Sequence, residues 1–382
     1  MPTPPLALYV HIPWCVRKCP YCDFNSHGAR EIPEAAYLQA LLADLETDLE
    51  RLPHRALESV FIGGGTPSLF SPQTIGRLLE RVARRPGLAH DAEITLEANP
   101  GTLEQARFRG FRDAGVNRLS IGAQSLDDTL LQRLGRIHDA RAVVEAVTAA
   151  RDAGFANLNL DLMCALPGQT PAQARADLDA ALALEPEHLS WYELTLEAET
   201  PFGRHPPDLP DEDTRAAMQE AGRERLQRAG FEHYEVSAHA RPGHRCRHNL
   251  NYWQFGDYLG IGAGAHGKHT LPQGRILRRW KRADPGAFMA AAMAGDAVAG
   301  SETLDPAEAA FDFALNGLRL TEGVPMSLFT QRTGLPAVHL EPARGTAVAR
   351  GLLQDRPDRL RPTDLGRRYL DDLVALFIPQ GN

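Results

Sequence analysis

The stretch HIPWCVRKCPYCDF, residues 11–24, contains Cys15, Cys19 and Cys22 within eight positions, although the chain of 382 residues has only five cysteines. It directly follows a β-type run, Leu8–Ile12, so the thiols are expected in a loop at the end of a strand. An odd number of cysteines, three of them clustered, argues against a disulfide framework and favours a reducing compartment. The spacing is instead typical of a site that binds a metal or an iron–sulfur cluster.

Three thiolates can hold three irons of a [4Fe–4S] cluster and leave the fourth iron open to a ligand that is not protein. A structural zinc site is the alternative, and it requires four ligands that close the coordination sphere. The fourth zinc ligand would then be one of His11, His27, Cys164 or Cys246.

Short β-type runs alternate with segments that have helical spacing of leucine and alanine, such as those starting at Tyr37, Thr74, Ala140 and Ala172. The predicted strands are Leu8–Ile12, Ser59–Ile62, Glu93–Leu96, Arg118–Ile121, Asn157–Leu162, Leu189–Leu194 and Tyr234–Ser237. Repeated strand–helix units predict an α/β fold with parallel strands, here a partial (β/α) barrel. We expect this barrel to span residues 1–300 and a smaller, mainly helical C-terminal domain to span residues 301–382.

The cysteine motif, with the aromatic Tyr21 before its last cysteine, resembles that of the radical S-adenosylmethionine (SAM) enzymes. The resemblance implies that Cys15, Cys19 and Cys22 ligate a [4Fe–4S] cluster whose open iron binds SAM. Further candidates for SAM contacts lie just after the predicted strands, where a barrel places its chemistry. They are Gly64, Gly65 and Thr66, whose free N–H groups would meet the methionine end, with Glu97, Gln124, Arg136 and Asp161.

The motifs LYVHIPWC, GGGTPS, EANP, LSIGAQS, LGRIHDA, HNLNYW and YLGIGAGAHG resemble the oxygen-independent coproporphyrinogen III oxidase family. They add Tyr9 and His266 to the candidate cofactor contacts. Two departures favour the heme chaperones of the HemW type over the oxidases. Phe24 occupies the position of a further oxidase cysteine, and only seven residues precede the first predicted strand.

HNLNYW, residues 248–253, is similar to the hallmark of the HemW type. The residues themselves suggest that His248 ligates heme iron and that Tyr252 and Trp253 stack on the porphyrin, with Arg245 and Arg247 near its propionates. A satisfied core histidine is the structural alternative for His248. His266 is a candidate for the cofactor site or for a second heme ligand.

The net charge of −8 argues against general nucleic-acid binding, although RILRRWKR, residues 275–282, predicts a local basic patch. We expect a cytoplasmic protein that meets membranes only peripherally, through clients, because the start lacks the features of a signal peptide. No long apolar run of about 18 residues occurs.

The resemblance therefore implies a chaperone that uses a [4Fe–4S] cluster and SAM and delivers heme to respiratory hemoproteins. No residue is assigned a catalytic role, and whether the protein is an enzyme is left open. The first alternative is radical oxidative decarboxylation of coproporphyrinogen III to protoporphyrinogen IX. The second is a purely structural iron–sulfur or zinc protein.

Overall fold

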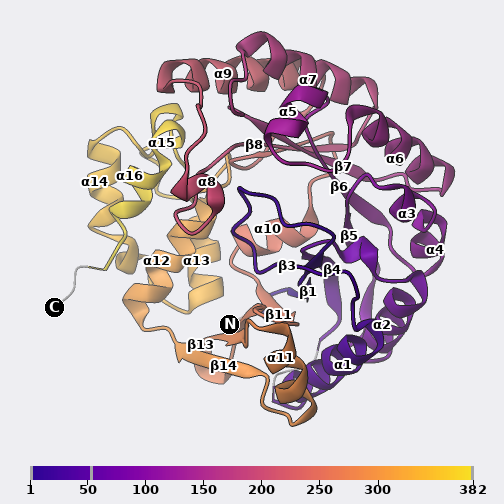
Figure 1. The fold of residues 1–382 in the computed structure, drawn as a ribbon. Helices are drawn as coiled ribbons and strands as arrows, with labels where there is room; N and C mark the ends of the chain where they lie inside the picture. The colour runs from indigo at the N-terminus through magenta and orange to yellow at the C-terminus, as the bar shows by residue number, and fades with distance from the viewer. Residues whose placement is uncertain (1–2, 52–54, 380–382) are drawn as a thin grey trace.

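A computed structural model describes residues 3–51 and 55–379, and it contains the predicted α/β barrel (Figure 1). The consecutive parallel strands are β1 (Leu6–Ile12), β4 (Leu57–Gly64), β5 (Leu88–Ala98), β6 (Arg118–Gln124), β7 (Leu158–Cys164) and β8 (His188–Glu193). The intervening helices are α1 (Glu34–Arg51), α2 (Pro72–Arg84), α3 (Thr102–Gln105), α4 (Phe108–Asp113), α5 (Asp128–Arg133), α6 (Ala140–Asp152) and α7 (Pro171–Ala183). These helices form the outer arc of the ring in Figure 1.

The strands alternate between an apolar outer face and a polar inner face, as the twofold repeat of a strand requires. Outer residues such as Leu8, Val60 and Leu119 belong to the apolar core beneath the helices. Inner residues such as Ser120 and Asp161 line a cavity inside the barrel. The barrel therefore has a polar interior, and its strand ends can present several polar side chains at once.

The sheet continues on both sides of the parallel strands. On one side, β8 pairs with the short antiparallel strand β10 (Ala238–Ala240), and β10 pairs in turn with β9 (Glu232–His233). Helices α8 (Pro201–Arg204) and α9 (Glu212–Arg228) lie between β8 and β9 in the chain. On the other side, β11 (Asp257–Ile261) runs parallel to β1 and continues into the antiparallel strands β12 (His266–Thr270), β13 (Ile276–Lys281) and β14 (Val298–Thr303). The connecting helices are α10 (Arg247–Trp253) and α11 (Pro285–Met293). The resulting 12-stranded sheet has β14 and β9 at its two edges.

Two expectations differ from this arrangement. The strand predicted at Tyr234–Ser237 is wrong, because these residues connect β9 to β10; the buried Tyr234 hydroxyl contacts His188 Nε2 at 2.8 Å. The strands β11–β14 had no counterpart among the predicted strands. Their glycines and charged residues interrupt both the apolar runs and the strict apolar–polar alternation by which strands are recognised, as in HGKHT and ILRRWK.

The C-terminal part is mainly helical, as expected. Its elements are α12 (Pro306–Gly317), β15 (Val324–Pro325), α13 (Met326–Thr333), α14 (Ala343–Ala349), β16 (Arg359–Leu360), α15 (Asp364–Arg368) and α16 (Leu370–Ala375). Phe313, Phe329 and Leu373 belong to a second apolar cluster, which also includes Phe255 from the preceding region. The boundary predicted at residue 300 falls inside β14, which ends at Thr303.

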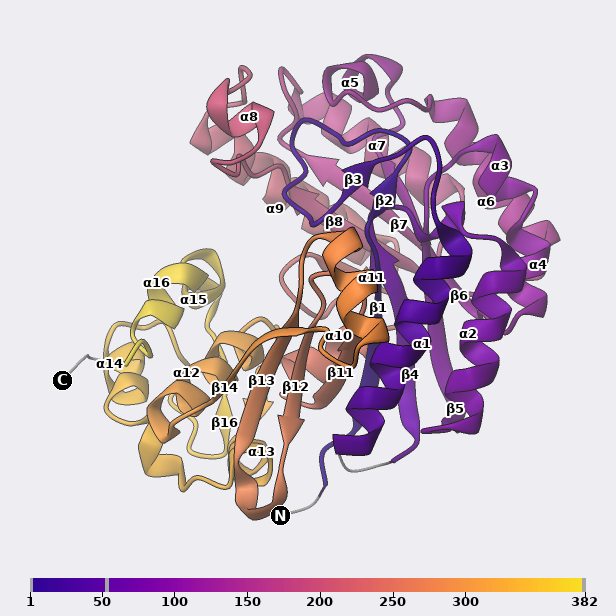
Figure 2. The same cartoon turned by 60° about the horizontal axis from the view of Figure 1, so that its bottom comes forward.

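The C-terminal helices lie beside both ends of the sheet (Figures 1 and 2). Next to β9, Glu235 forms a bridge with Leu320 and an ion pair with Arg319 at 3.3 Å. On β13, Arg278 pairs with Asp312 of α12 at 3.1 Å. These contacts join the two edges of the open barrel through the C-terminal segment.

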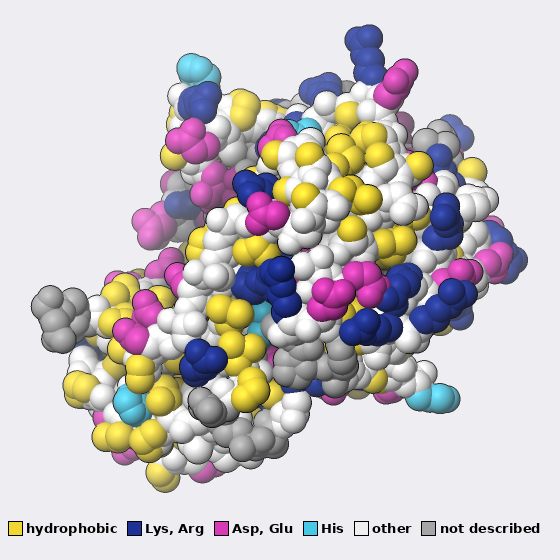
Figure 3. Space-filling model, turned by 90° about the horizontal axis from the view of Figure 1, so that it is seen from below, with side chains coloured by type: hydrophobic (Ala, Val, Ile, Leu, Met, Phe, Trp, Pro, Cys, Tyr) yellow, Lys and Arg dark blue, Asp and Glu magenta, His cyan; other side chains and the backbone are white. Residues whose placement is uncertain are grey.

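The expected basic patch at residues 275–282 does not exist as a patch. Arg279 and Lys281 are buried against Asp48 and Asp44 of α1, at 2.8 and 2.5 Å. Arg282 is paired with Asp296. On the face that Figure 3 shows, Lys and Arg side chains lie among Asp and Glu side chains. In the part of the chain that the structure describes, no helix is long and apolar enough to cross a bilayer.

Lys281 is a sensitive point of this buried ionic cluster because its Nζ contacts both Asp44 and Asp48, the latter at 2.8 Å. Replacing Lys281 with Met leaves both carboxylates without this cation, so we expect a loss of about 3–5 kcal/mol in unfolding free energy. Urea denaturation measures it. The matched control, Arg282→Met, breaks an exposed pair and should cost less than about 1 kcal/mol. Equal losses in the two variants would contradict the assignment.

Candidate functional site

The cysteine loop begins in β2 (Trp14–Cys15) and ends in β3 (His27–Gly28), which pairs with it in parallel. Backbone bonds from His27 N–H to the Pro13 carbonyl (2.8 Å) and from Ala29 N–H to the Cys15 carbonyl (3.1 Å) close the loop. Asn25, a residue of this loop, holds it to the rest of the barrel, because its side-chain amide donates to the carbonyls of Ala263 and Ala283, at 3.0 and 2.8 Å. The loop is thereby attached to the segments that follow β11 and β13.

The three loop cysteines are half-buried free thiols. Burial raises the pKa of Cys15 and of Cys22, while hydrogen bonds from Thr66 and Ser26 oppose the shift at Cys15. Cys19 and Cys22 each act electrostatically on Cys15, so the three sulfurs share one neighbourhood. Among the described residues, no group of three or more His, Cys, Asp or Glu is placed to hold a single metal ion. Three thiols on one loop are the donor set that a [4Fe–4S] cluster takes from a protein.

The glycine loop after β4 fastens the cysteine loop to the barrel. Gly65 N–H donates to the Ile12 carbonyl at 2.8 Å, and Thr66 N–H donates to the Trp14 carbonyl at 2.7 Å. A Cβ on Gly65 would lie 2.5 Å from the Trp14 carbonyl oxygen, so only glycine fits. Gly64 N–H donates to Glu97 Oε2 at 3.0 Å. The expectation that these N–H groups are free for a ligand is therefore wrong, because all of them bond within the protein.

A chain of polar contacts connects four loops around the thiols. Asn99 Nδ2 donates to Thr66 Oγ1 at 2.9 Å, and Arg136 Nη2 donates to Asn99 Oδ1 at 2.7 Å. Arg136 Nη1 also lies 3.4 Å from Cys19 Sγ. The guanidinium of Arg136 also acts electrostatically on the hydroxyl of Tyr21, which therefore lies in the same network. Thr66, Arg136 and Tyr21, which the sequence singled out separately, thus meet at the cysteine loop.

Glu97 and Asp161 project into the barrel interior. Burial, with the Asp161 carboxyl nearby, raises the pKa of Glu97 to about 8, so this side chain is largely protonated at neutral pH. Asp161 accepts hydrogen bonds from Ser120 Oγ and Asn159 Nδ2, at 3.0 and 2.8 Å. Gln124, the last residue of β6, has a positive φ of 67°. Its Oε1 accepts a hydrogen bond from the hydroxyl of Tyr192 at 2.9 Å.

Helix α10, which carries HNLNYW, lies inside the ring of strands (Figure 1). His248 is only 1% exposed, and its Nδ1 and Nε2 contact Ser59 Oγ and Tyr252 Oη at 3.0 and 2.9 Å. Burial and the charge of Arg118 lower the pKa of His248 to about 3, which keeps the imidazole neutral. Both ring nitrogens are therefore engaged within the protein, in contrast to the heme-ligand role predicted from sequence. Arg245 and Arg247, predicted near propionates, are paired with Glu232 and Asp91.

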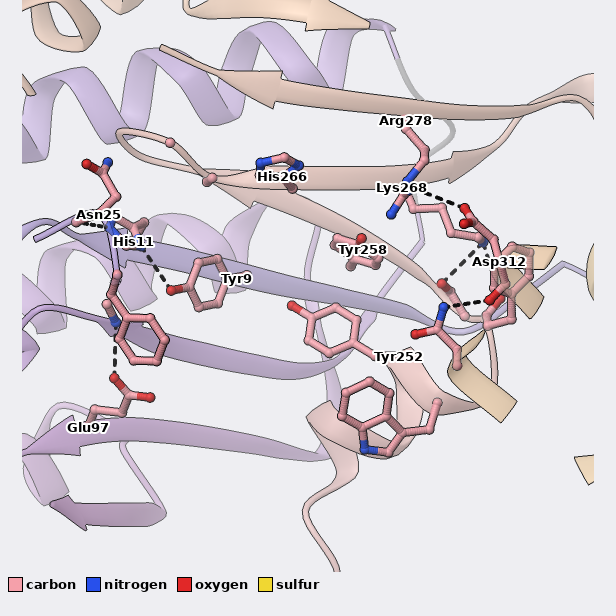
Figure 4. A pocket seen from close by; sticks show the side chains of 18 residues that line it. Tyr9, His11, Asn25, Glu97, Tyr252, Tyr258, His266, Lys268, Arg278 and Asp312 are labelled. Carbon is pink, nitrogen blue, oxygen red and sulfur yellow. Dashed lines mark hydrogen bonds and ion pairs between the residues drawn. The ribbon is translucent and has the colours of Figure 1, made fainter. Parts of the chain in front are cut away.

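Two neighbouring cavities share Tyr9, Glu97 and Tyr252. The smaller, about 250 Å³, lies in the barrel interior and contains Asp161 and His248. The larger, about 460 Å³, extends from the cysteine loop to α12, and its volume is within the range of ligand sites. Figure 4 shows Tyr9, His11 and Glu97 at one end of the larger cavity and Lys268, Arg278 and Asp312 at the other.

Tyr9 and His11 form a fixed pair at the first end. His11 Nε2 lies 2.8 Å from the Asn25 carbonyl, which can only accept, so this nitrogen carries the proton. His11 Nδ1 then accepts a hydrogen bond from the Tyr9 hydroxyl, 2.9 Å away. Burial raises the pKa of Tyr9 and keeps it a donor.

Several residues of the site were missed from the sequence. Asn99 is part of the EANP motif and could have been found, because it directly follows the end of β5 at Ala98. Asn25, Tyr258, Lys268 and Arg278 gave no local signal, since they reach the larger cavity through segments that are distant in sequence.

Comparison with known proteins agrees with these features. Residues 9–181 match the model of the radical SAM superfamily, and residues 304–369 match that of the HemN C-terminal domain. The chain is 47% identical to a protein of Escherichia coli named heme chaperone HemW and 45% identical to its counterpart in Haemophilus influenzae, covering 99% of each chain in both cases. Among solved structures, coproporphyrinogen III oxidase (HemN) of Escherichia coli superposes with a TM-score of 0.83 at 22% identity. The superposition covers 99% of this chain and 91% of the oxidase.

The close packing at Gly65 generates a prediction about cluster assembly. Gly65→Ala should push the Trp14 peptide away and displace Cys15, so reconstitution should yield less iron and sulfide per chain, with unchanged far-ultraviolet circular dichroism. Gly76→Ala in α2 is the control, because its Cβ would lie 3.6 Å from the nearest side chain, an ordinary contact. Wild-type cluster content in Gly65→Ala would refute this role of the loop.

The raised pKa of Glu97 generates a second prediction. The folded state of the cofactor-free protein holds a proton on Glu97 that the unfolded chain releases above its ordinary pKa of 4.5. Stability should therefore fall as the pH rises, by about 2 kcal/mol between about pH 6 and pH 8. Glu97→Gln removes this titration, so its unfolding free energy should fall less over the same interval. Parallel pH profiles for both proteins, from urea denaturation, would contradict the buried neutral carboxyl.

Proposed function

Since this chain belongs to the HemW family within the radical SAM superfamily, we propose that it is a heme chaperone, which binds heme and delivers it to heme-requiring proteins. The observation that carries the proposal is its 47% identity, over 99% of both chains, to a protein named heme chaperone HemW. Respiratory hemoproteins are the proposed clients, and the cytoplasm is the proposed location.

The proposal includes two resident cofactors. Cys15, Cys19 and Cys22 would hold a [4Fe–4S] cluster, and SAM would bind next to it, at the end of the larger cavity formed by Tyr9, Gly64 and Glu97. The chemistry that such a cluster would supply is the transfer of one electron to SAM. Thr66, Gln124, Arg136 and Asp161 orient the surrounding loops and strand ends through their hydrogen bonds.

The residues of this chain have distinct tasks in such a site. Arg136 places its guanidinium 3.4 Å from Cys19 Sγ, where it would offset negative charge on a cluster ligand. Glu97, protonated at neutral pH, adds no negative charge near an anionic methionine carboxylate. Tyr9, held by His11, presents an aromatic face between the two cavities.

The alternative function, oxidation of coproporphyrinogen III, has the support of a shared fold alone. An anaerobic assay of cluster-reconstituted protein with SAM and a reductant distinguishes the two. We expect one heme to bind per chain, seen in the Soret band, and no protoporphyrinogen IX to form from coproporphyrinogen III. Formation of that product together with 5′-deoxyadenosine would establish the oxidase, and failure to bind heme would remove the chaperone.

A further inference from the structure

We infer that His266, rather than His248, is the protein ligand to heme iron, and that heme occupies the part of the larger cavity toward α12, beyond the end proposed for SAM. The inference rests on the proposed function and specifies where its cargo binds.

His266 has the accessibility that an axial ligand requires. It is the first residue of β12, and its exposed side chain lines the larger cavity. Its ring stacks against Trp280, with 6.3 Å between ring centroids, which orients the imidazole. Within residues 3–51 and 55–379, the ring makes no hydrogen bond or ion pair. A neutral imidazole with a free nitrogen is the form that binds metals.

The other histidines near the barrel centre do not meet this requirement. His248 has both nitrogens engaged, by Ser59 and Tyr252. His11 likewise contacts Tyr9 and the Asn25 carbonyl. Binding iron through either residue would break a buried hydrogen bond and leave its partner without one, which costs about 1–3 kcal/mol.

The strand pairing aligns His266 with other residues that suit a porphyrin. Tyr258 pairs with Lys268 in register, and Lys268 pairs with Arg278, so three adjacent strands present these side chains to the cavity. Tyr252 packs edge-on against Tyr258, with 4.5 Å between centroids. Figure 4 shows His266 and the two tyrosines between the ends of the cavity.

Apolar and charged groups complete the site. Phe24 of the cysteine loop lines the cavity while 61% exposed, an apolar face available for a macrocycle. At the opposite end, Arg278 is partly exposed and its pair with Asp312 is on the cavity wall, so the guanidinium can also meet a propionate. Lys268 is engaged by Asp257 at 3.0 Å and by two backbone carbonyls. The site therefore suits a planar, anionic tetrapyrrole with a central metal.

The test compares heme with iron-free protoporphyrin IX in titrations of the full chain. For His266→Leu we expect the dissociation constant for heme to rise at least about tenfold, since even a supporting contact at a metal site is worth that much. The Soret band should shift as well. Affinity for protoporphyrin IX should not change, because that ligand has no iron for His266 to bind. His339→Ala, which removes an exposed histidine of the C-terminal segment, is the matched control.

A rescue experiment tests the same assignment by supplying the missing iron ligand from solution. In His266→Gly, added imidazole should restore the wild-type Soret position, while imidazole should leave the His339→Ala spectrum unchanged.

The outcomes separate the inference from its premise. Unaltered heme affinity and spectrum in His266→Leu would overturn the assignment, as would an equal loss of heme and protoporphyrin IX binding. Wild-type protein that binds no heme would instead overturn the proposed function.

Discussion

The close backbone contact between the glycine loop and the Trp14 peptide is the constraint on which the rest of the site depends. The loop must lie within hydrogen-bond distance of residues 12 and 14 for Gly65 and Thr66 to donate there. This contact fixes the peptide that carries Cys15, and Asn99 and Arg136 then extend the network to Cys19. The glycine motif looks like a loop that binds a ligand through free N–H groups, but its N–H groups instead hold the backbone of the cysteine loop in place.

Burial inside the barrel determines the protonation states of several polar side chains around Arg118. Arg118 is buried there and, among the described side chains, has no hydrogen bond or ion pair. Burial is the main cause that lowers the pKa of His248 and raises the pKa of Glu97. The charge of Arg118 adds to the shift at His248, and Asp161 adds to the shift at Glu97, so His248 stays neutral and Glu97 keeps its proton. Helix α10 occupies this interior, which explains why HNLNYW contributes hydrogen bonds to the core.

Much of this fold could be predicted from sequence because each strand–helix unit of the barrel is locally encoded. Cysteine spacing and polar residues at strand ends likewise singled out Cys15, Arg136 and Glu97, which the structure places at the cysteine loop and the adjoining cavity. The remainder depends on long-range contacts. His248 looks like a ligand in its motif, and only the three-dimensional arrangement shows Ser59 occupying its free nitrogen. The basic run at 275–282 looks like a surface patch, yet Asp44 and Asp48 lie more than 200 residues away.

The contacts of the C-terminal segment with both edges of the sheet have a mechanical consequence. A closed barrel can admit a ligand only through its ends, whereas this barrel has a lateral seam held by the pairs Arg278–Asp312 and Glu235–Arg319. Because Arg278 and Asp312 both line the larger cavity, the first pair forms part of the wall between that cavity and the seam. On this side the larger cavity is therefore bounded by side chains rather than by the backbone hydrogen bonds that join neighbouring strands elsewhere in the sheet.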